Sequence, residues 1–367
     1  MPDHPHEATV EVRVGDRLVG PGHPCVVIAE IGVNHNGSLA TARALVAAAK
    51  SAGADYAKFQ TFRADHLVTR GAAKAPYQRR QDGGTETQYD MLKRLELRRG
   101  DFAELKRFCG EQGIGFLSTP YGEEDAALLD ELGVDAIKVP SALIVEPAFL
   151  RTLAAYGRPL ILSTGMAALS DVRRAVETVC ETGNTQIIVL QCTTDYPTAP
   201  EDANVRVVRT LAETLGVPVG FSDHTRSMAA AIAAVALGAS VIEKHLTLDK
   251  RMEGPDHAAS AEPQEFSALV GAVRETELAL GRPDKQPTAS EHTNARSMRR
   301  SIVTSRSISV GETVQPDMIA FKRPGTGIPP RNLPEVVGAR ARVEIPADAL
   351  IEWWMLDRTG NRRAPGV

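Results

Sequence analysis

The sequence has little of what marks several large classes of protein. Its 42 Lys and Arg residues do not outnumber its 46 Asp and Glu residues, and with a net charge of −4 we expect no nucleic-acid partner. The longest apolar run, Met228–Ala239, is well short of the roughly 18 residues that a membrane span needs. The N-terminal residues contain no apolar stretch typical of a secretory signal. We therefore expect a cytoplasmic protein with no membrane partner.

Cysteine is scarce, and its placement argues against two further classes. The four cysteines, Cys25, Cys109, Cys180 and Cys192, form no Cys-x-x-Cys pair, and three of the four lie inside apolar segments. This pattern favours reduced thiols over a disulfide framework or a zinc ribbon. Hydrophobic residues at 43% and charged residues at 24% are values of a folded chain, which argues against wholesale disorder. A length of 367 residues predicts two or three domains.

Short apolar runs recur along the chain and alternate with amphipathic stretches. We predict eight strands: Val26–Gly32, Tyr56–Thr61, Gly115–Pro120, Ala136–Ser141, Pro159–Gly165, Ile187–Thr193, Pro218–His224 and Val241–His245. Helices are predicted between most of them, at Leu39–Ala52, Asp101–Gln112, Asp125–Leu132, Ser170–Glu181 and Met228–Leu237. This alternation is typical of parallel βαβ units in an α/β protein. Eight evenly spaced units favour a (β/α)8 TIM barrel, with a doubly wound open sheet as the alternative.

Two segments depart from this repeating pattern. Residues 9–20 alternate in hydrophobicity around a Gly-Asp pair, which is typical of a β-hairpin. After Gly281 the chain becomes polar and contains proline, and from Met298 onward β-like runs alternate with turn residues. We predict an N-terminal hairpin extension at 1–21, a barrel at 22–283, a linker at 284–297, a small mainly β domain at 298–358 and a tail at 359–367.

Polar side chains gather at the ends of all eight predicted strands. In strand order they are Glu30, Lys58 with Gln60, Ser118 with Thr119, Lys138 with Ser141, Ser163 with Thr164, Thr193 with Thr194, Ser222 with Asp223 and His224, and Glu243 with Lys244 and His245. A single polar residue at a strand end is usually a turn or cap residue. Eight together are typical of an enzyme, because barrel active sites form at the C-terminal ends of the strands.

Two histidines, His224 and His245, end adjacent strands and are expected to face the same mouth. Neutral imidazoles are common ligands of transition metals, so the pair indicates a metal site, with two structural histidines as the alternative. Nearby carboxylates could orient the ligands: Asp223, Glu243 and Asp256. We expect His257 at the loop surface, with a third metal ligand as the alternative.

Two lysines and several hydroxyl groups form a second candidate cluster: Lys58, Lys138, Ser141, Ser163 and Ser222. Two fixed cations beside hydroxyl donors suit a phosphate or a carboxylate. Alternatively, in a Schiff-base aldolase one of the two lysines would form a covalent Schiff base with the substrate. A structural salt bridge with Glu30 or Asp223 is the remaining alternative.

Ordered motifs across the chain resemble those of the sialic acid synthase family. They are AEIGVNHNG (29–37), KFQT (58–61), KAPYQ (74–78), QYDMLKRLEL (88–97), FLSTP (116–120), LSTGM (162–166), FSDHT (221–225), IEKHLTLDK (242–250), MEGPDHAAS (252–260) and FKRPGTGI (321–328). The motifs KAPYQ and QYDMLKRLEL resemble the bacterial N-acetylneuraminate and legionaminate synthases in particular. The resemblance implies a TIM barrel followed by an antifreeze-like SAF domain. It also implies condensation of phosphoenolpyruvate with an N-acetylated hexosamine aldehyde, giving a nine-carbon 3-deoxy-ulosonic acid and phosphate.

The same resemblance implies roles for individual residues. His224 and His245 would hold a divalent cation, Mn²⁺ or Mg²⁺, that polarises the aldehyde oxygen. The phosphoenolpyruvate phosphate and carboxylate would be held by Lys58, Lys138, Ser141, Ser163 and Ser222. The sugar pocket would be lined by Gln60, Thr119, Tyr196 and Asp256. Glu30, Glu243 or Asp256 would move protons, with Lys58 beside them, and the sequence does not choose among the three carboxylates.

Arg323, in the KRPGTG motif, matches an arginine of the SAF domain. The resemblance implies that it enters the barrel of a partner chain and contacts the sugar N-acetyl group, since a guanidinium hydrogen-bonds well to a carbonyl oxygen. A homodimer in which each SAF domain completes the partner's active site is therefore implied. An ordinary surface arginine is the alternative.

Three positions depart from the family pattern. This sequence has Leu143 where the family usually has a glutamate, Gln191 where it has a histidine, and Thr326 where it has an asparagine. Because the phosphoenolpyruvate and metal positions are intact, we expect the same chemistry on an altered acceptor. Leu143 favours a less hydroxylated acceptor, such as the 6-deoxy, diamino precursor of legionaminate or an unusual sugar aldehyde. A non-catalytic sugar-binding barrel is the alternative from another class, and a class I lysine aldolase is the alternative enzyme.

Overall fold

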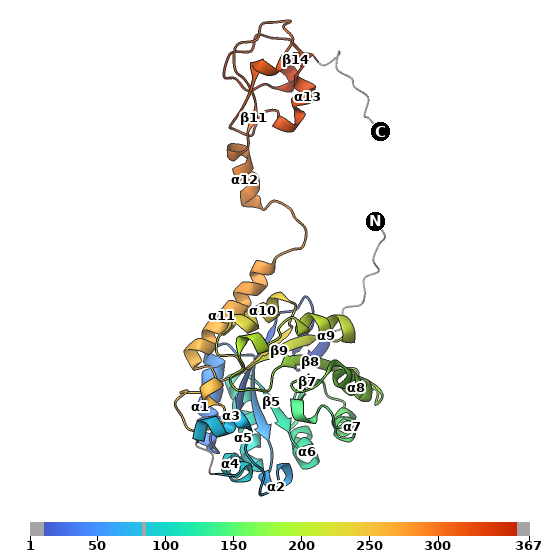
Figure 1. Cartoon of the computed structure of the whole chain (residues 1–367), viewed down its shortest axis with the longest axis vertical. Helices are drawn as coiled ribbons and strands as arrows, with labels where there is room; N and C mark the ends of the chain where they lie inside the picture. Colours follow the sequence, from blue (N-terminus) through green and yellow to red (C-terminus); the bar gives the residue numbers. More distant parts are fainter. Residues whose placement is uncertain (1–10, 83–85, 358–367) are drawn as a thin grey trace. The chain divides into compact units, whose positions relative to one another are not determined.

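The computed structural model describes residues 11–82 and 86–357, and the chain divides into two compact units, Met1–Gly281 and Arg282–Val367 (Figure 1). The predicted tail at 359–367 and the first ten residues of the predicted extension lie outside the described residues. In the described part of the chain, no helix is both long enough and apolar enough to cross a membrane.

Eight parallel strands close into a barrel in the first unit. They are β3 (Val26–Gly32), β4 (Tyr56–Thr61), β5 (Gly115–Pro120), β6 (Ile137–Val139), β7 (Leu160–Ser163), β8 (Ile187–Cys192), β9 (Val219–Asp223) and β10 (Val241–His245). Pairing of β10 with β3, from Val241 opposite Val26 onward, closes the sheet. This closure confirms the predicted TIM barrel and excludes the open sheet. Four strands, β6 to β9, are shorter than predicted because their polar ends turn out of the ladder into loops.

Helices surround the strands of this unit (Figure 1). They are α1 (Leu39–Ser51), α2 (Ala64–Leu67), α3 (Pro76–Asp82), α4 (Gln88–Leu95), α5 (Arg99–Gln112), α6 (Glu123–Leu132), α7 (Pro147–Ala155), α8 (Leu169–Cys180), α9 (Val207–Leu215), α10 (Ala229–Ala236) and α11 (Pro263–Leu280). Local signals set their limits: the Ser38 side chain accepts a hydrogen bond from the Thr41 amide at the start of α1, and Gly113 ends α5 in the left-handed conformation.

Residues that point into the barrel change character along each strand. On β3, for example, Val26 and Ile28 belong to an apolar cluster inside the barrel, and the next inward residue is Glu30. A hairpin of β1 (Val12–Val14) and β2 (Arg17–Val19) adds its valines to this cluster, and the Tyr56 hydroxyl donates to the Val14 carbonyl oxygen at 2.9 Å. Apolar packing therefore fills the barrel at the N-terminal ends of the strands, and its polar residues gather at the C-terminal ends.

Within its described residues, 282–357, the second unit has four short strands and its own core. Its elements are α12 (Ala289–Met298), β11 (Ser301–Thr304), β12 (Ile319–Lys322), α13 (Leu333–Val336), β13 (Arg340–Ala341) and β14 (Leu356–Asp357). Apolar side chains that include Ile302, Ile308 and Ile345 are fully buried among them. The segment predicted as a linker, 284–297, contains most of helix α12, which has no buried residue.

Candidate active site

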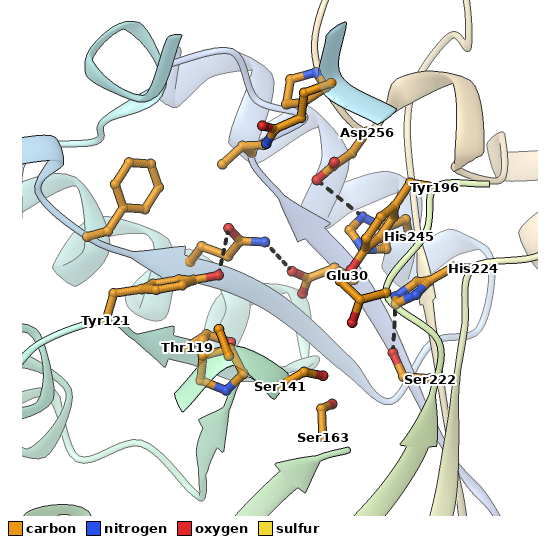
Figure 2. Close-up of a pocket in the computed structure, with 18 of the residues that line it drawn as sticks. Glu30, Thr119, Tyr121, Ser141, Ser163, Tyr196, Ser222, His224, His245 and Asp256 are labelled. Carbon is orange, nitrogen blue, oxygen red and sulfur yellow. Dashed lines mark hydrogen bonds and ion pairs between the residues drawn. The ribbon is translucent and has the colours of Figure 1, made fainter. Parts of the chain in front are cut away.

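A cavity of about 310 Å³ opens at the C-terminal ends of the barrel strands (Figure 2). Every site residue predicted for the barrel lines it: Glu30, Lys58, Gln60, Thr119, Lys138, Ser141, Ser163, Tyr196, Ser222, His224, Glu243, His245 and Asp256. In Figure 2, His224, His245 and Asp256 lie on one side of the pocket and Thr119 and Tyr121 on the other. Seven of the eight barrel strands and the loops that follow them thus bring the predicted residues together.

Lys58 forms a buried ion-pair cluster with two glutamates. Its Nζ lies 2.6 Å from Glu30 Oε2 and 3.6 Å from Glu243 Oε2, and it donates to Thr119 Oγ1 at 3.3 Å. Burial would lower the pKa of Lys58, but the two carboxylates outweigh it and raise that pKa. Burial and the nearby Glu243 raise the pKa of Glu30 against the opposing effect of Lys58. The salt bridge between Lys58 and Glu30, which was one of the alternatives for this lysine, is therefore present in the folded chain.

Lys138 is also buried, but among the described residues no carboxylate oxygen lies within 4 Å of it. Its Nζ donates to Ser163 Oγ at 2.6 Å and to the Val139 carbonyl oxygen at 3.2 Å. Burial lowers its pKa, and the more distant charge of Glu243 only partly opposes this effect. Ser141 and Ser222 line the same cavity. A buried cation with hydroxyl groups around it is suited to a bound anion.

A close backbone approach holds Ser141 in this cluster. The Gly165 amide donates to Ser141 Oγ at 3.0 Å, just after the end of β7. A Cβ at position 165 would lie 2.2 Å from Thr194 Oγ1 and 2.9 Å from Ser141 Oγ, closer than atoms can pack. Only glycine therefore allows the backbone to reach the serine hydroxyl here.

The two histidines lie together, with ring centroids 5.4 Å apart. His224 Nδ1 is 2.7 Å from the Thr193 carbonyl oxygen, so it carries the proton and Nε2 presents a lone pair. His245 Nδ1 is buried without a hydrogen bond and lies 3.7 Å from Asp256 Oδ2. Burial lowers the pKa of both histidines, so both rings are neutral near pH 7. Tyr196 stacks on His224 at a centroid distance of 4.1 Å and fixes the ring.

These imidazoles fit a divalent metal ion. A metal-binding histidine usually donates its other ring N–H to a carbonyl or carboxylate, and His224 does so to Thr193, while its Nε2 lies 3.4 Å from Ser222 Oγ. His245 Nδ1 is buried with no hydrogen bond and is therefore available as a ligand atom. Within residues 11–82 and 86–357 no group of three or more His, Cys, Asp or Glu side chains has a metal-binding arrangement. Two protein ligands would leave positions for water and substrate.

The carboxylates of the pocket differ in their charge at neutral pH. Burial raises the pKa of Asp256 to about 7, with the charge of Glu30 adding to the effect and Lys58 opposing it. Burial also acts on Glu243, but the ammonium groups of Lys138 and Lys58 outweigh it and hold the pKa of Glu243 below its usual value. Asp256 can therefore exchange a proton near pH 7, whereas Glu243 stays ionised.

Sequence reasoning missed two tyrosines of the pocket. Tyr121 follows β5 directly, and its hydroxyl lies 3.4 Å from Gln60 Oε1, while Gln60 Nε2 donates to Glu30 Oε1 at 3.0 Å. Tyr77 contacts the Tyr196 ring at a centroid distance of 4.8 Å. Tyr77 belongs to the KAPYQ motif, so that motif was the available signal.

Two predictions for residues near the histidines are wrong. His257 is not at the loop surface: it is 1% exposed, and its ring nitrogens face Thr247 and Asn36 rather than the cavity. Asp223 does not orient the histidines, because it points out of the barrel and pairs with Lys244, with Oδ2 2.8 Å from Nζ. Asp223 is likewise not the partner of a pocket lysine.

Two of the departing residues do not line the pocket. Leu143 packs against the core between the strands and helices, and its neighbour Ala142 lines the cavity instead. Gln191 points out of the barrel, with Nε2 3.4 Å from the Ala203 carbonyl oxygen. Neither position supports the prediction of an altered acceptor.

Arg323 and Thr326 lie in the second unit, and both are exposed. Arg323 Nε donates to the Met298 carbonyl oxygen at 3.0 Å, at the end of α12.

Comparison with known proteins covers nearly the whole chain. The model of the NeuB family matches residues 45–285, and that of the SAF domain matches residues 299–357. The N,N'-diacetyllegionaminic acid synthase of Legionella pneumophila is 41% identical over 91% of this chain and 95% of its own length. The human N-acetylneuraminate-9-phosphate synthase is 36% identical over 94% of this chain and 96% of its own length.

Solved structures agree with these sequence relatives. The N-acetylneuraminic acid synthetase of Leptospira borgpetersenii matches with a TM-score of 0.69 and 31% identity, over 79% of this chain and 96% of that chain. The spore coat polysaccharide biosynthesis protein SpsE of Bacillus subtilis matches with a TM-score of 0.65 and 35% identity, over 95% of this chain and 99% of that chain. The chain therefore belongs to the NeuB family, as a barrel synthase followed by a SAF domain.

Proposed function

We propose that the protein condenses phosphoenolpyruvate with an N-acetylated amino-sugar aldehyde and releases phosphate and a nine-carbon 3-deoxy-ulosonic acid. The observation that carries this proposal is Lys138, a buried cation with serine hydroxyls around it and, among the described residues, no carboxylate within 4 Å. An anionic substrate would supply the missing charge. The named synthases among the relatives support the same class of reaction.

Phosphoenolpyruvate would occupy the floor of the pocket. Its phosphate and carboxylate would contact the cationic and hydroxyl groups of this floor: Lys58, Lys138, Ser141, Ser163 and Ser222. Carbon 3 of phosphoenolpyruvate would bond to the aldehyde carbon, whose oxygen takes a proton. The electrons of the bond come from the C2=C3 double bond, so water would add to the electron-poor carbon 2 and lose a proton. The new hydroxyl would then lose its proton to form the ketone as the bond from carbon 2 to the phosphate oxygen breaks and phosphate leaves with its electron pair. These proton transfers need a group that titrates near pH 7.

Asp256 is the best-suited proton carrier of the three carboxylates. Its pKa of about 7 allows both donation and acceptance near neutral pH. Glu30 would act close to the sugar through Gln60, and Glu243 would stay ionised between the two lysines. The acceptor would then lie against Gln60, Thr119, Tyr196 and Asp256.

His224 and His245 would hold Mn²⁺ or Mg²⁺ through neutral imidazoles. A divalent ion bound there supplies Lewis-acid polarisation of the aldehyde oxygen. Tyr196 would keep the His224 ring in place through its stacking contact.

We further propose a cytoplasmic homodimer in which the SAF domain completes the partner's active site. Arg323 would contact the acetamido oxygen of an acceptor bound to the partner chain. The exposure of this guanidinium and the SAF match over residues 299–357 support the assignment.

Three kinds of acceptor fit this chemistry. N-acetylmannosamine would give N-acetylneuraminate, and its 6-deoxy, diamino analogue would give a legionaminate-type product. Identities of 41% and 40% to two N,N'-diacetyllegionaminic acid synthases, against 36% to the human N-acetylneuraminate-9-phosphate synthase, support the second. An unusual sugar aldehyde would be a third.

Phosphate release from phosphoenolpyruvate tests the proposal. Reactions would contain Mn²⁺ and each acceptor, with and without a chelator, and the ulosonic acid would be measured separately. We expect phosphate and ulosonic acid in equal amounts, only with an acceptor and only without chelator. Binding of phosphoenolpyruvate without turnover of any acceptor would favour a non-catalytic barrel.

Borohydride distinguishes the lysine aldolase. Reduction in the presence of pyruvate or phosphoenolpyruvate would link substrate covalently to Lys58 or Lys138 if either formed a Schiff base. We expect no mass increase. Covalent labelling of either lysine would overturn the proposed mechanism.

A further inference from the structure

The loop that carries Asp256 is tied to the loop after β3 by side-chain hydrogen bonds. Five residues outside the cavity make these bonds, and we call them the loop latch: Asn34, Asn36, Thr247, His257 and Ser260. Asn36 Nδ2 donates to the Glu253 carbonyl oxygen at 3.0 Å, three residues before Asp256. The latch therefore joins two segments more than 200 residues apart in the sequence.

The backbone of Asp256 itself is held from the same side. Its carbonyl oxygen accepts a hydrogen bond from Ser260 Oγ at 2.7 Å. Ser260 Oγ accepts in turn from Asn34 Nδ2 at 2.8 Å, and the same amide donates to the Leu246 carbonyl oxygen at 2.9 Å. These bonds fix where the Asp256 side chain leaves the backbone.

His257 is the centre of the latch, and its partners select one tautomer. Its Nδ1 lies 2.7 Å from Thr247 Oγ1 and its Nε2 lies 3.3 Å from Asn36 Oδ1. Because the Asn36 amide nitrogen already donates to Glu253, its oxygen must face His257, so Nε2 carries the proton. The Thr247 hydroxyl has one proton and two acceptors, His257 Nδ1 at 2.7 Å and the Asp249 carbonyl oxygen at 3.1 Å, and with Nε2 protonated the nearer Nδ1 accepts it. A neutral ring satisfies both contacts.

Gly254 lets the loop lie directly on this ring. A Cβ there would lie 2.6 Å from His257 Cδ2 and 3.0 Å from Asn36 Oδ1, and the backbone has a φ of +155°. Any side chain at position 254 would therefore push the loop away from the ring.

We propose that His257 and Asn36 are positioning residues that hold the Asp256 carboxylate beside His245, although neither residue lines the cavity. The proposal rests on the proposed function, in which Asp256 serves the acceptor side of the reaction. The carboxylate lies 3.7 Å from His245 Nδ1. A loop freed from the latch would leave this position, and the floor residues that bind phosphoenolpyruvate would be unaffected because they lie on other strands.

Substitution of His257 tests this role. His257→Leu removes both ring contacts, whereas His257→Gln keeps an N–H donor toward Asn36. We expect His257→Leu to lower kcat about 10- to 100-fold and to raise the KM for the acceptor several-fold, with the KM for phosphoenolpyruvate within twofold of wild type. His257→Gln should recover most of kcat. His292→Leu, an exposed histidine of α12, is the matched control and should leave all three values unchanged.

A double-mutant cycle with Asp256→Asn separates positioning from a general structural effect. If His257 acts through Asp256, His257→Leu will have no further effect on kcat in the Asp256→Asn background. The proposal would be overturned if the kcat losses of the two single variants multiplied in the double variant. An equal rise of both KM values in His257→Leu would overturn it as well.

Thr247→Val provides the test if His257→Leu does not fold, since it removes one hydroxyl with little change of shape. It should show the same KM pattern with a smaller loss of kcat, and an unchanged acceptor KM and kcat would overturn the proposal. If wild type releases no phosphate with any acceptor, the proposed function fails and this role fails with it. If wild type is active and the cycle is additive, only this role fails.

Discussion

Replacing Lys58 with Met is expected to destabilise the barrel far more than replacing Lys58 and Glu30 together. The single change leaves the carboxylates of Glu30 and Glu243 buried without the ammonium group that lies 2.6 Å and 3.6 Å from them. Removing one partner of a buried ion pair costs about 3–5 kcal/mol, because the remaining charge is neither hydrated nor paired.

The double variant Lys58→Met with Glu30→Gln removes both charges. Glu243 keeps the nearby charge of Lys138 and its hydrogen bond from Ser222 Oγ at 2.9 Å. Since replacing both members of a buried pair by neutral groups is often nearly neutral, we expect the double variant to regain all but about 1–2 kcal/mol. Both variants should be inactive, so the double variant would regain stability without regaining activity.

Urea unfolding near pH 7.5, followed by far-UV circular dichroism with metal chelated, measures the two free energies of unfolding. The deficit of Lys58→Met should shrink as the pH falls, because Glu30 takes up a proton and the buried charge disappears. Equal destabilisation of the single and double variants would refute the reasoning. So would a deficit that does not change with pH.

Three further changes have defined outcomes. Burial lowers the pKa of His35 to about 4, so the unfolded chain binds a proton that the folded chain does not, and the stability that His35 contributes is lost as the pH falls from about 6.5 to about 4. His35→Asn should remove about 3 kcal/mol of this pH dependence, measured by urea unfolding across that range, and an unchanged slope would contradict it. Gly165→Ala should abolish phosphate release and lower the melting temperature, because the added Cβ would lie 2.2 Å from Thr194 Oγ1; an active, stable variant would contradict this packing. Lys244→Met should cost about 3–5 kcal/mol in urea unfolding by leaving Asp223 unpaired outside the barrel, and a change below about 1 kcal/mol would show that this pair is dispensable.

The barrel was predictable because each strand has clear local limits. β3, β4, β5 and β10 match their predicted bounds to the residue, and the last residue of each strand is glycine, proline or polar: Gly32, Thr61, Pro120 and His245. β6 to β9 were predicted one or two residues too long at their C-terminal ends, where polar residues such as Ser141, Thr164, Thr193 and His224 leave the ladder. Helices α2 and α3 are only four and seven residues long, too short for a clear periodic pattern, whereas α4 is amphipathic and buries Met91 and Leu95.

The candidate site was predictable where strand alternation decides which way a side chain points. On β8, Leu190 and Cys192 face inward, so the neighbouring Gln191 had to face outward, and alternation alone could have corrected that prediction. Leu143 lies in a 3₁₀ turn, where alternation gives no guidance. The burial of His257 depends on Asn36, 221 residues away, and no local pattern reveals such a partner.

Binding of phosphoenolpyruvate to wild type and to Lys138→Met tests the central claim most directly. The claim is that a buried lysine without a carboxylate partner among the described residues is the anion site of the pocket. A charge-assisted contact of this kind contributes about 1.5–3 kcal/mol, so we expect the Kd in isothermal titration calorimetry to rise about 10- to 100-fold, with the melting temperature unchanged or higher. An unchanged Kd in a folded variant would contradict the account, because it would place phosphoenolpyruvate away from Lys138.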